Sequence, residues 1–158
     1  MVRDHSYWMH KALEQAERAR SMGEVPIGAV IVHEGRIIAR AHNLRETKQD
    51  PAGHAELLAI RKAAKKLGTW RLQEAVLYVT LEPCLMCTGA IILARIQTVV
   101  YGCRDPKAGA LGSCYDLSNE ASLNHRFQVI SGIEQERCSQ MLSDFFARLR
   151  ASRKSKSS

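Results

Sequence analysis

Apolar residues recur at helical spacing along residues 4–22, and a glycine followed by a proline ends this segment. A short apolar run rich in β-branched residues, 27–32, is typical of a buried strand. A Glu-Gly turn leads into a second apolar segment at 36–41, so the two segments predict a β-hairpin. Residues 43–53 are polar and contain an Asp-Pro pair, which predicts a loop.

The middle of the chain alternates between helical and strand patterns. Residues 54–67 have helical periodicity and end in a lysine pair before a glycine, as helix dipole and capping preferences favour. A strand is predicted at 75–81, a buried helix at 84–94 and a further strand at 98–102. Strand, helix and strand in so short a segment predict a βαβ unit with parallel strands.

The last third of the chain completes the predicted architecture. Residues 105–113 form a Gly-rich loop, a short helix is expected near 115–122, and a strand at 127–131 precedes a final helix from Glu134 onward. An antiparallel hairpin and a parallel βαβ unit together predict a five-stranded mixed sheet. With helices between the strands, we expect the α/β class and a three-layer α/β/α sandwich.

Composition places this fold in a single domain. The chain has 158 residues, of which 46% are hydrophobic, enough for one domain with a substantial core. No apolar run approaches the roughly 20 residues that span a bilayer, and no signal-peptide core is present. We therefore expect a cytoplasmic protein with no membrane association. An odd number of cysteines, five, argues against a disulfide framework.

Positive charge is concentrated at the C-terminus. The net charge is +7, and the last eleven residues contain five cations and no acid: Arg148, Arg150, Arg153, Lys154 and Lys156. We expect one domain at 1–150 and a basic tail at 151–158. The tail could be a solvated end, or it could contact the phosphates of a nucleic acid, and composition leaves both interpretations open.

Two short motifs carry the candidate chemistry, His54-Ala55-Glu56 and Pro83-Cys84-Leu85-Met86-Cys87, and each opens a predicted helix. Cys84 and Cys87 are three residues apart, so their sulfurs lie on one side of the first helical turn. A helix N-terminus lowers the pKa of a thiol, and two thiolates with one imidazole suit zinc. With three protein ligands, such a zinc keeps one position for water, as catalytic zinc sites do.

Other interpretations of these residues remain. Cys103, Cys114 or Cys138 could supply a fourth ligand and close the site, although a lone cysteine is more often a small buried apolar residue. The Cys84–Cys87 pair alone could be a redox pair. Glu56 could be an acid that favours a helix N-terminus, but beside the metal motif it is better placed to carry protons as a general acid–base.

The combined pattern H-x-E…P-C-x-x-C is the signature of zinc deaminases that act on nucleobases. Beyond it, the sequence closely resembles the bacterial tRNA-specific adenosine deaminases, a family within the zinc-dependent cytidine and deoxycytidylate deaminase superfamily. The resemblance covers about residues 4–150. It rests on residues 25–30, 43, 50–51, 54–56, 80–90, 94–96, 99–102, 105–113, 124–125 and 143–146.

The resemblance implies a cytidine deaminase-like fold and a metal centre in which His54, Cys84 and Cys87 hold one Zn²⁺ per chain. It further implies hydrolytic conversion of the wobble adenosine of a tRNA anticodon loop to inosine, on an arginine tRNA in the family. In that reaction zinc-activated water attacks C6 of adenine. Glu56 takes a proton from the water, delivers it to N1 and later serves the leaving ammonia.

The resemblance also implies substrate contacts and an assembly. Asn43 would hydrogen-bond the flipped nucleoside, the backbone N–H of Ala55 would bind the base, and Asp105 would face the sugar–phosphate path of the RNA. The family is homodimeric, so we expect a homodimer in which the helix at 84–94 supplies much of the interface.

Two other functions stay open at the level of sequence. The zinc motif does not exclude a deaminase of a free base or nucleotide, of the cytosine, guanine or deoxycytidylate type. A zinc-stabilised RNA-binding module without activity is the second alternative, and it would need a fourth protein ligand and no use for Glu56. The loop at 104–113 and the basic tail favour an RNA substrate.

Overall fold

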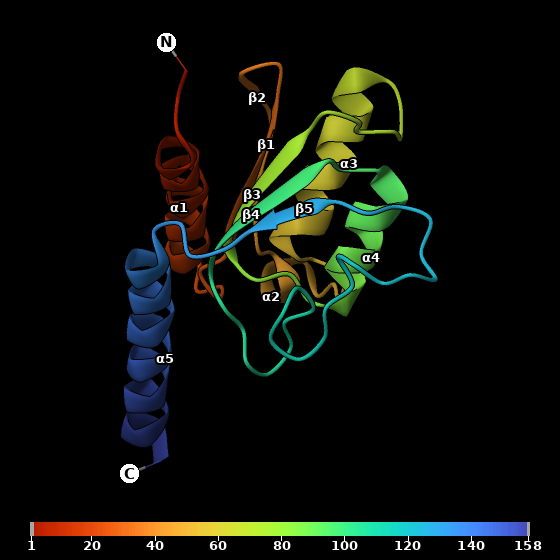
Figure 1. The fold of residues 1–158 in the computed structure, drawn as a ribbon. Coiled ribbons are helices and arrows are strands. Elements are labelled where there is room, and N and C mark those ends of the chain that lie inside the picture. Colours follow the sequence, from red (N-terminus) through yellow and green to blue (C-terminus); the bar gives the residue numbers. More distant parts are fainter. Residues whose placement is uncertain (1, 158) are drawn as a thin grey trace.

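The computed structural model describes residues 2–157, with side chains described through Ser155. Its centre is a sheet with the strand order β2-β1-β3-β4-β5, and helices form a layer on each face (Figure 1). The β2-β1 and β1-β3 pairs are antiparallel, whereas β3-β4 and β4-β5 are parallel. The strands are β1 (Gly28–His33), β2 (Arg36–His42), β3 (Val76–Leu81), β4 (Thr98–Cys103) and β5 (Gln128–Ile130). The five-stranded mixed sheet of a three-layer sandwich is therefore confirmed.

One face of the sheet is covered by α1 (His5–Ser21) and α5 (Gln135–Ser157), which lie together on the left of Figure 1. The helix α1 packs very closely on β1, because a Cβ atom at Gly28 would come within 2.1 Å of the backbone oxygen of Ala12. Only glycine permits this approach, so Gly28 fixes how near the first helix lies to the sheet.

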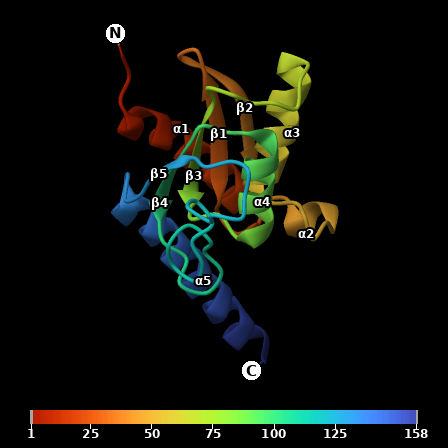
Figure 2. The ribbon, with the colours of Figure 1, turned by 45° about the vertical axis from the view of Figure 1, so that its right-hand side comes forward.

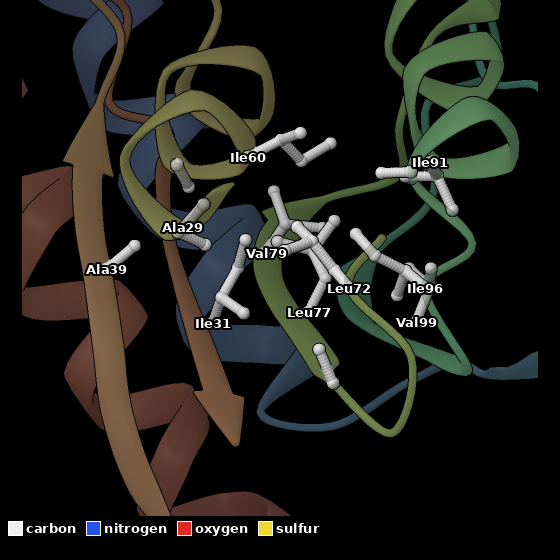
Figure 3. Close-up of a cluster of buried hydrophobic side chains, with 14 of the residues drawn as sticks. Ala29, Ile31, Ala39, Ile60, Leu72, Leu77, Val79, Ile91, Ile96 and Val99 are labelled. Carbon is white, nitrogen blue, oxygen red and sulfur yellow. The ribbon is translucent and has the colours of Figure 1, made fainter. Parts of the chain in front are cut away.

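The other face is covered by α3 (Ala55–Leu67) and α4 (Leu85–Ala94), and it holds the larger apolar core. Ile60 of α3 and Ile91 of α4 point toward the strands, where Val79 lies between them (Figure 3). These aliphatic contacts hold the two helices side by side. Their N-terminal ends meet at one end of the sheet, which places the candidate site.

A short helix, α2 (Arg45–Lys48), interrupts the segment 43–53, for which a loop was predicted throughout. The buried carboxylate of Glu24 explains it, since it accepts the backbone N–H groups of Glu46 and Thr47 at 3.1 and 2.6 Å. These are N–H groups that a helix start leaves without partners. The capping carboxylate lies 22 residues away in sequence, so no local pattern could predict it.

The prediction of a short helix at 115–122 is wrong. The structure has turns there and one isolated bridge between Leu111 and Asp116. The Asp116 carboxylate accepts both the backbone N–H and the hydroxyl of Ser118, at 3.1 and 2.6 Å. Such local side-chain hydrogen bonds compete with helical ones and favour a turn.

The predicted basic tail at 151–158 continues the helix α5, which runs without interruption to Ser157. Figure 2 shows α5 extending past the sheet, away from the N-terminus. Ser158 and the side chain of Lys156 lie outside the described residues, and the division between domain and tail at residue 150 stays a prediction. Within residues 2–157, no helix combines the length and the apolar character needed to cross a bilayer.

Candidate metal centre and catalytic pocket

The three predicted ligands come together at the N-terminal ends of α3 and α4. His54 and Cys84 each occupy the residue just before a helix, in extended backbone conformation, and neither side chain caps its own helix. Their side chains are therefore free to meet between the helices. Cys87 lies in the first turn of α4 and is fully buried. The helix starts at 54 and 84 were each predicted one residue early, which does not affect the site.

The geometry of the three ligand atoms fits a tetrahedral metal. The Nδ1 atom of His54 lies 3.6 Å from Sγ of Cys84 and 3.5 Å from Sγ of Cys87. Zinc bonds of about 2.0–2.1 Å to nitrogen and 2.3 Å to sulfur, at tetrahedral angles, would separate such atoms by about 3.6 Å. All three ligand atoms lie within 4.8 Å of one another. The donor set and its spacing both suit Zn²⁺, and they identify Nδ1 as the ligating nitrogen.

A hydrogen bond between the Cys84 and Cys87 thiols moves their pKa values in opposite directions. The hydrogen bond from Cys87, aided by His54, lowers the pKa of Cys84 to about 4, although burial opposes the shift. Because the Cys87 thiol donates that hydrogen bond and is buried, its own pKa is raised. A divalent cation between the sulfurs favours loss of the second proton as well.

Glu56 is a buried carboxyl group beside this cluster, with only 4% of its surface exposed. Burial raises the pKa of Glu56 to about 7, and a hydrogen bond from its own backbone N–H, together with the nearby His54, offsets only part of that rise. The Cys87 thiol also lies within hydrogen-bonding reach of this carboxyl group, as an alternative acceptor to Cys84. A carboxyl group whose pKa is near neutrality is suited to both accept and donate a proton.

A cavity of about 480 Å³ opens over the cluster. It is lined by His54, Glu56 and Cys84, and the structure brings all three predicted substrate-binding residues to its wall: Asn43, Ala55 and Asp105. Its remaining lining comes from Val25, Ile27, Arg45, Leu81, Glu82, Arg104, Pro106, Lys107, Ala108, Leu142 and Phe146. This volume is within the range of small-molecule sites, about 300–1,000 Å³.

Two of these substrate-binding candidates, Asn43 and Asp105, also form hydrogen bonds to backbone groups of the pocket loops. Asn43 is 5% exposed. Its amide donates to the backbone oxygen of Val25 at 3.3 Å, and its side-chain oxygen accepts the N–H of Arg45 at 3.1 Å. The Asp105 carboxylate accepts the N–H groups of Lys107 and Ala108 at 3.1 and 3.2 Å, which is the turn role that an acid has at such a position.

The sequence analysis missed Glu82, which anchors the opposite wall of the pocket. This carboxylate is 2% exposed. It accepts the N–H groups of Asp105, Leu111 and Ser113 at 3.1, 2.9 and 3.1 Å, and also the Ser113 hydroxyl. A Cβ atom at Gly109 would come within 2.3 Å of the Glu82 carboxyl carbon. Glu82 thus ties the loop that carries Asp105 to the end of β3.

The three other cysteines lie outside the cluster. Cys103 and Cys138 are buried in the core under α1 and α5, and Cys114 is exposed. Burial raises the pKa of Cys103 to about 11 and that of Cys138 to about 12. Within the described part of the chain, the only group able to hold a metal is His54, Cys84 and Cys87.

Comparison with known proteins agrees with this site. The MafB19-like deaminase family matches residues 3–150. A tRNA-specific adenosine deaminase of Bacillus subtilis (strain 168) is 53% identical over 154 residues, which cover 98% of this chain and 95% of the relative. The chain belongs to the family of tRNA-specific adenosine deaminases. All the ligands and pocket residues lie within the matched residues, whereas the last turns of α5 lie beyond the family match at 3–150.

Solved structures place the fold with this family. One, from studies of A-to-I editing by tRNA:A34 deaminases at the wobble position of transfer RNA, has a TM-score of 0.84 and 43% identity. The matched region covers 87% of this chain and 100% of the solved chain. A guanine deaminase of Bacillus subtilis has a TM-score of 0.62 and 42% identity, over 65% of this chain and 66% of its own. The expected deaminase fold is confirmed.

Proposed function

We propose that this protein is a zinc-dependent hydrolase that converts the wobble adenosine of a tRNA anticodon loop to inosine. The observation that carries the proposal is a buried Glu56 carboxyl group beside a three-ligand His54, Cys84 and Cys87 cluster that opens into a pocket. Three ligands leave a position for water, as a hydrolytic centre needs. The family membership supports adenosine in tRNA as the substrate.

The protein's own groups account for the proton transfers. When bound, zinc would supply a Lewis acid that lowers the pKa of water toward 7. Glu56 takes a proton from the attacking water and delivers it to N1 of adenine as the C6–O bond forms. It then takes the remaining proton from the new C6 hydroxyl and passes it to the amino group, so that the C6=O bond forms as the C6–N bond breaks and ammonia leaves. One carboxyl group can both accept and donate these protons because its pKa is near neutrality, so that its charged and neutral forms are both accessible.

The pocket walls would orient the base. The backbone N–H of Ala55 lies at the start of α3, where helical N–H groups lack partners within the helix and can bind the base. The Asn43 amide has a second hydrogen beyond the one that it donates to Val25, and this hydrogen is the donor that we assign to the flipped nucleoside. Asp105 would face the sugar–phosphate path.

Basic residues continue from the pocket toward the C-terminus. A groove next to it is lined by Arg45, Arg150 and Arg153, and Arg45 and Phe146 belong to both hollows. Arginine binds phosphates well, and an exposed aromatic ring can stack on an unpaired base. This groove supports RNA as the substrate class. By resemblance to the family, we propose an arginine tRNA and a cytoplasmic location.

We also propose a homodimer that forms through α4. This helix is apolar on all sides, yet Leu93, Leu85 and Met86 remain 70%, 46% and 39% exposed. Large apolar side chains gathered on one helix are typical of an interface. Analytical ultracentrifugation is expected to give a dimer that Leu93→Glu dissociates, and a fully active wild-type monomer would contradict the dimer.

The likeness to a guanine deaminase keeps a free base as the second candidate substrate. The deciding experiment incubates purified zinc-loaded protein with an anticodon stem-loop that carries a wobble adenosine, and in parallel with free guanine and free adenosine. We expect inosine in the RNA and no ammonia from the free compounds. Ammonia from guanine with unchanged RNA would support the second candidate, and no ammonia from any of them would indicate a binding module.

A further inference from the structure

A second cavity, of about 750 Å³, lies between the first turns of α1 and the turn that joins β1 to β2. We call it the hairpin cavity. Four of its lining residues are cations and none is acidic: Arg3, Lys11, Arg36 and Arg40. Its other lining residues are Val2, Tyr7, Trp8, Gly35 and Ile37. A basic hollow of this kind is suited to an anion.

One wall of the hairpin cavity holds its cations in place. The Arg3 guanidinium lies 4.3 Å from the centre of the Tyr7 ring and hydrogen-bonds the Tyr7 hydroxyl. The Lys11 ammonium lies 5.5 Å from the centre of the same ring. Tyr7 itself packs edge-on against the buried Trp8. Cations that are already positioned lose less conformational freedom when they bind an anion.

The opposite wall carries charges without counterions. Arg36 and Arg40 are exposed on β2, which is an edge strand. Among the described residues, no carboxylate forms an ion pair with Arg3, Arg36 or Arg40, and Lys11 pairs only with the exposed Glu14 at 3.5 Å. Like charges around one hollow repel one another, and a bound anion would relieve that repulsion.

The position of the hairpin cavity favours RNA phosphates as the anion. Strand β2 begins at Arg36 beside it and ends at His42, directly before the pocket residue Asn43. Seven strand residues span about 20 Å, at roughly 3.3 Å per residue. An RNA whose loop occupies the catalytic pocket and whose paired stem runs along β2 would bring its backbone phosphates to the hairpin cavity over that distance. We propose that the hairpin cavity binds phosphodiester groups in the stem of the substrate RNA, an inference that rests on the proposed function.

The test neutralises the two arginines of the edge strand. Arg36→Gln/Arg40→Gln is compared with Lys65→Gln/Lys66→Gln, which removes two exposed charges at the far end of α3. The probes are a tRNA transcript with a wobble adenosine and a short single-stranded oligonucleotide with the same anticodon. For the transcript, we expect the first variant to lower affinity about tenfold at low salt. The log–log salt slope should fall by about 1.5, because each phosphate that is no longer neutralised removes about 0.7–0.9.

Three further results are expected. The arginine variant should bind the short oligonucleotide as the wild type does, deaminate saturating tRNA at the wild-type rate, and unfold at the wild-type temperature. Wild-type tRNA affinity and salt slope in this variant would overturn the proposal, and so would an equal loss in the lysine control or an equal loss with the short oligonucleotide. Failure of the wild type to deaminate either RNA would instead refute the proposed function, while the binding measurements would still decide on the cavity.

Discussion

The centre and the walls of the catalytic pocket both depend on buried glutamates, but these glutamates have opposite electrostatic surroundings. Glu56, at the centre, has its pKa raised to about 7, chiefly by burial. Glu82, in the wall, and Glu24, which holds the helix α2 beside the wall, are as little exposed, yet their pKa values lie below the usual range. Burial alone would raise both, but several hydrogen bonds to each carboxylate outweigh it.

The number of available donors and the greater depth of Glu56 in the protein together explain the difference. Glu82 accepts three backbone N–H groups and a hydroxyl, and Glu24 accepts two backbone N–H groups. Carboxylates that satisfy so many donors stay ionised and hold loops in place. Glu56 has few donors and faces the metal ligands instead, so its proton can move. In the proposed mechanism the same type of side chain therefore serves structure around the pocket and chemistry at its centre.

The largest expected effect is that of Glu56→Gln. The substitution keeps the shape of the side chain and removes its proton chemistry, so single-turnover deamination should fall by about 10⁴-fold. Zinc content and tRNA affinity should stay near wild type, because Glu56 lies outside the candidate ligand group of His54, Cys84 and Cys87 and affinity comes mostly from phosphate contacts. Metal analysis and filter binding check these controls. A variant that retained a tenth of the wild-type rate would reduce Glu56 to a structural acid.

The same substitution at Glu82 provides the matched comparison. One carboxylate oxygen accepts Leu111 and Ser113 N–H groups, and the other accepts Asp105 N–H and the Ser113 hydroxyl. A glutamine amide must leave one of these pairs without an acceptor, which costs about 1–3 kcal/mol of unfolding free energy. We expect lower stability in denaturant titrations and a raised KM for tRNA, with kcat reduced less than tenfold.

If Glu82→Gln abolished turnover as completely as Glu56→Gln while its stability stayed unchanged, the separation between centre and walls would be wrong. Glu82 would then have to take part in the proton transfers. A Glu82→Asp variant sharpens the result, since it keeps the charge but shortens the reach to the loop. It should recover part of the stability that Glu82→Gln loses.

These two glutamates also show what could be predicted from sequence. The candidate metal ligands and Glu56 lie in two motifs of three and five residues, so their spacing and the deaminase signature were sufficient to predict that these residues come together. The sheet followed from short apolar runs. The wall carboxylates act on backbone groups 22 to 31 residues away, and nothing in the residues near Glu24 or Glu82 shows which loops they will hold. The same long-range capping explains why α2 was missed.

Exposed charges beside the pocket should affect binding alone. Arg150→Gln/Arg153→Gln changes the groove next to the pocket without touching a buried carboxylate. We expect weaker tRNA binding with an unchanged rate at saturation. The log–log salt slope should fall by about 0.7–0.9 for each phosphate that the variant no longer neutralises. Fluorescence titrations between low and physiological salt measure the slope. An unchanged slope would show that this part of α5 is only a solvated helix.

The smallest expected effect is the acid sensitivity that Glu24 confers. The folded-state pKa of Glu24 lies below the usual 4.5. Burial would raise it, but hydrogen bonds from the Thr47 side chain and from the backbone N–H groups of Thr47 and Glu46 stabilise the charged carboxylate and outweigh burial. A group with a lowered folded pKa stabilises the protein above its unfolded pKa, and this stabilisation is lost as the pH falls through the folded value.

Wild type should therefore exceed Glu24→Gln in unfolding free energy by about 1 kcal/mol at neutral pH, roughly the net value of one such hydrogen bond. The difference should shrink progressively below pH 4.5, as urea titrations at several pH values would show. A difference that stayed constant with pH would mean that the contribution of Glu24 comes from packing and not from its charge, and the contrast with Glu56 would then rest on Glu82 alone.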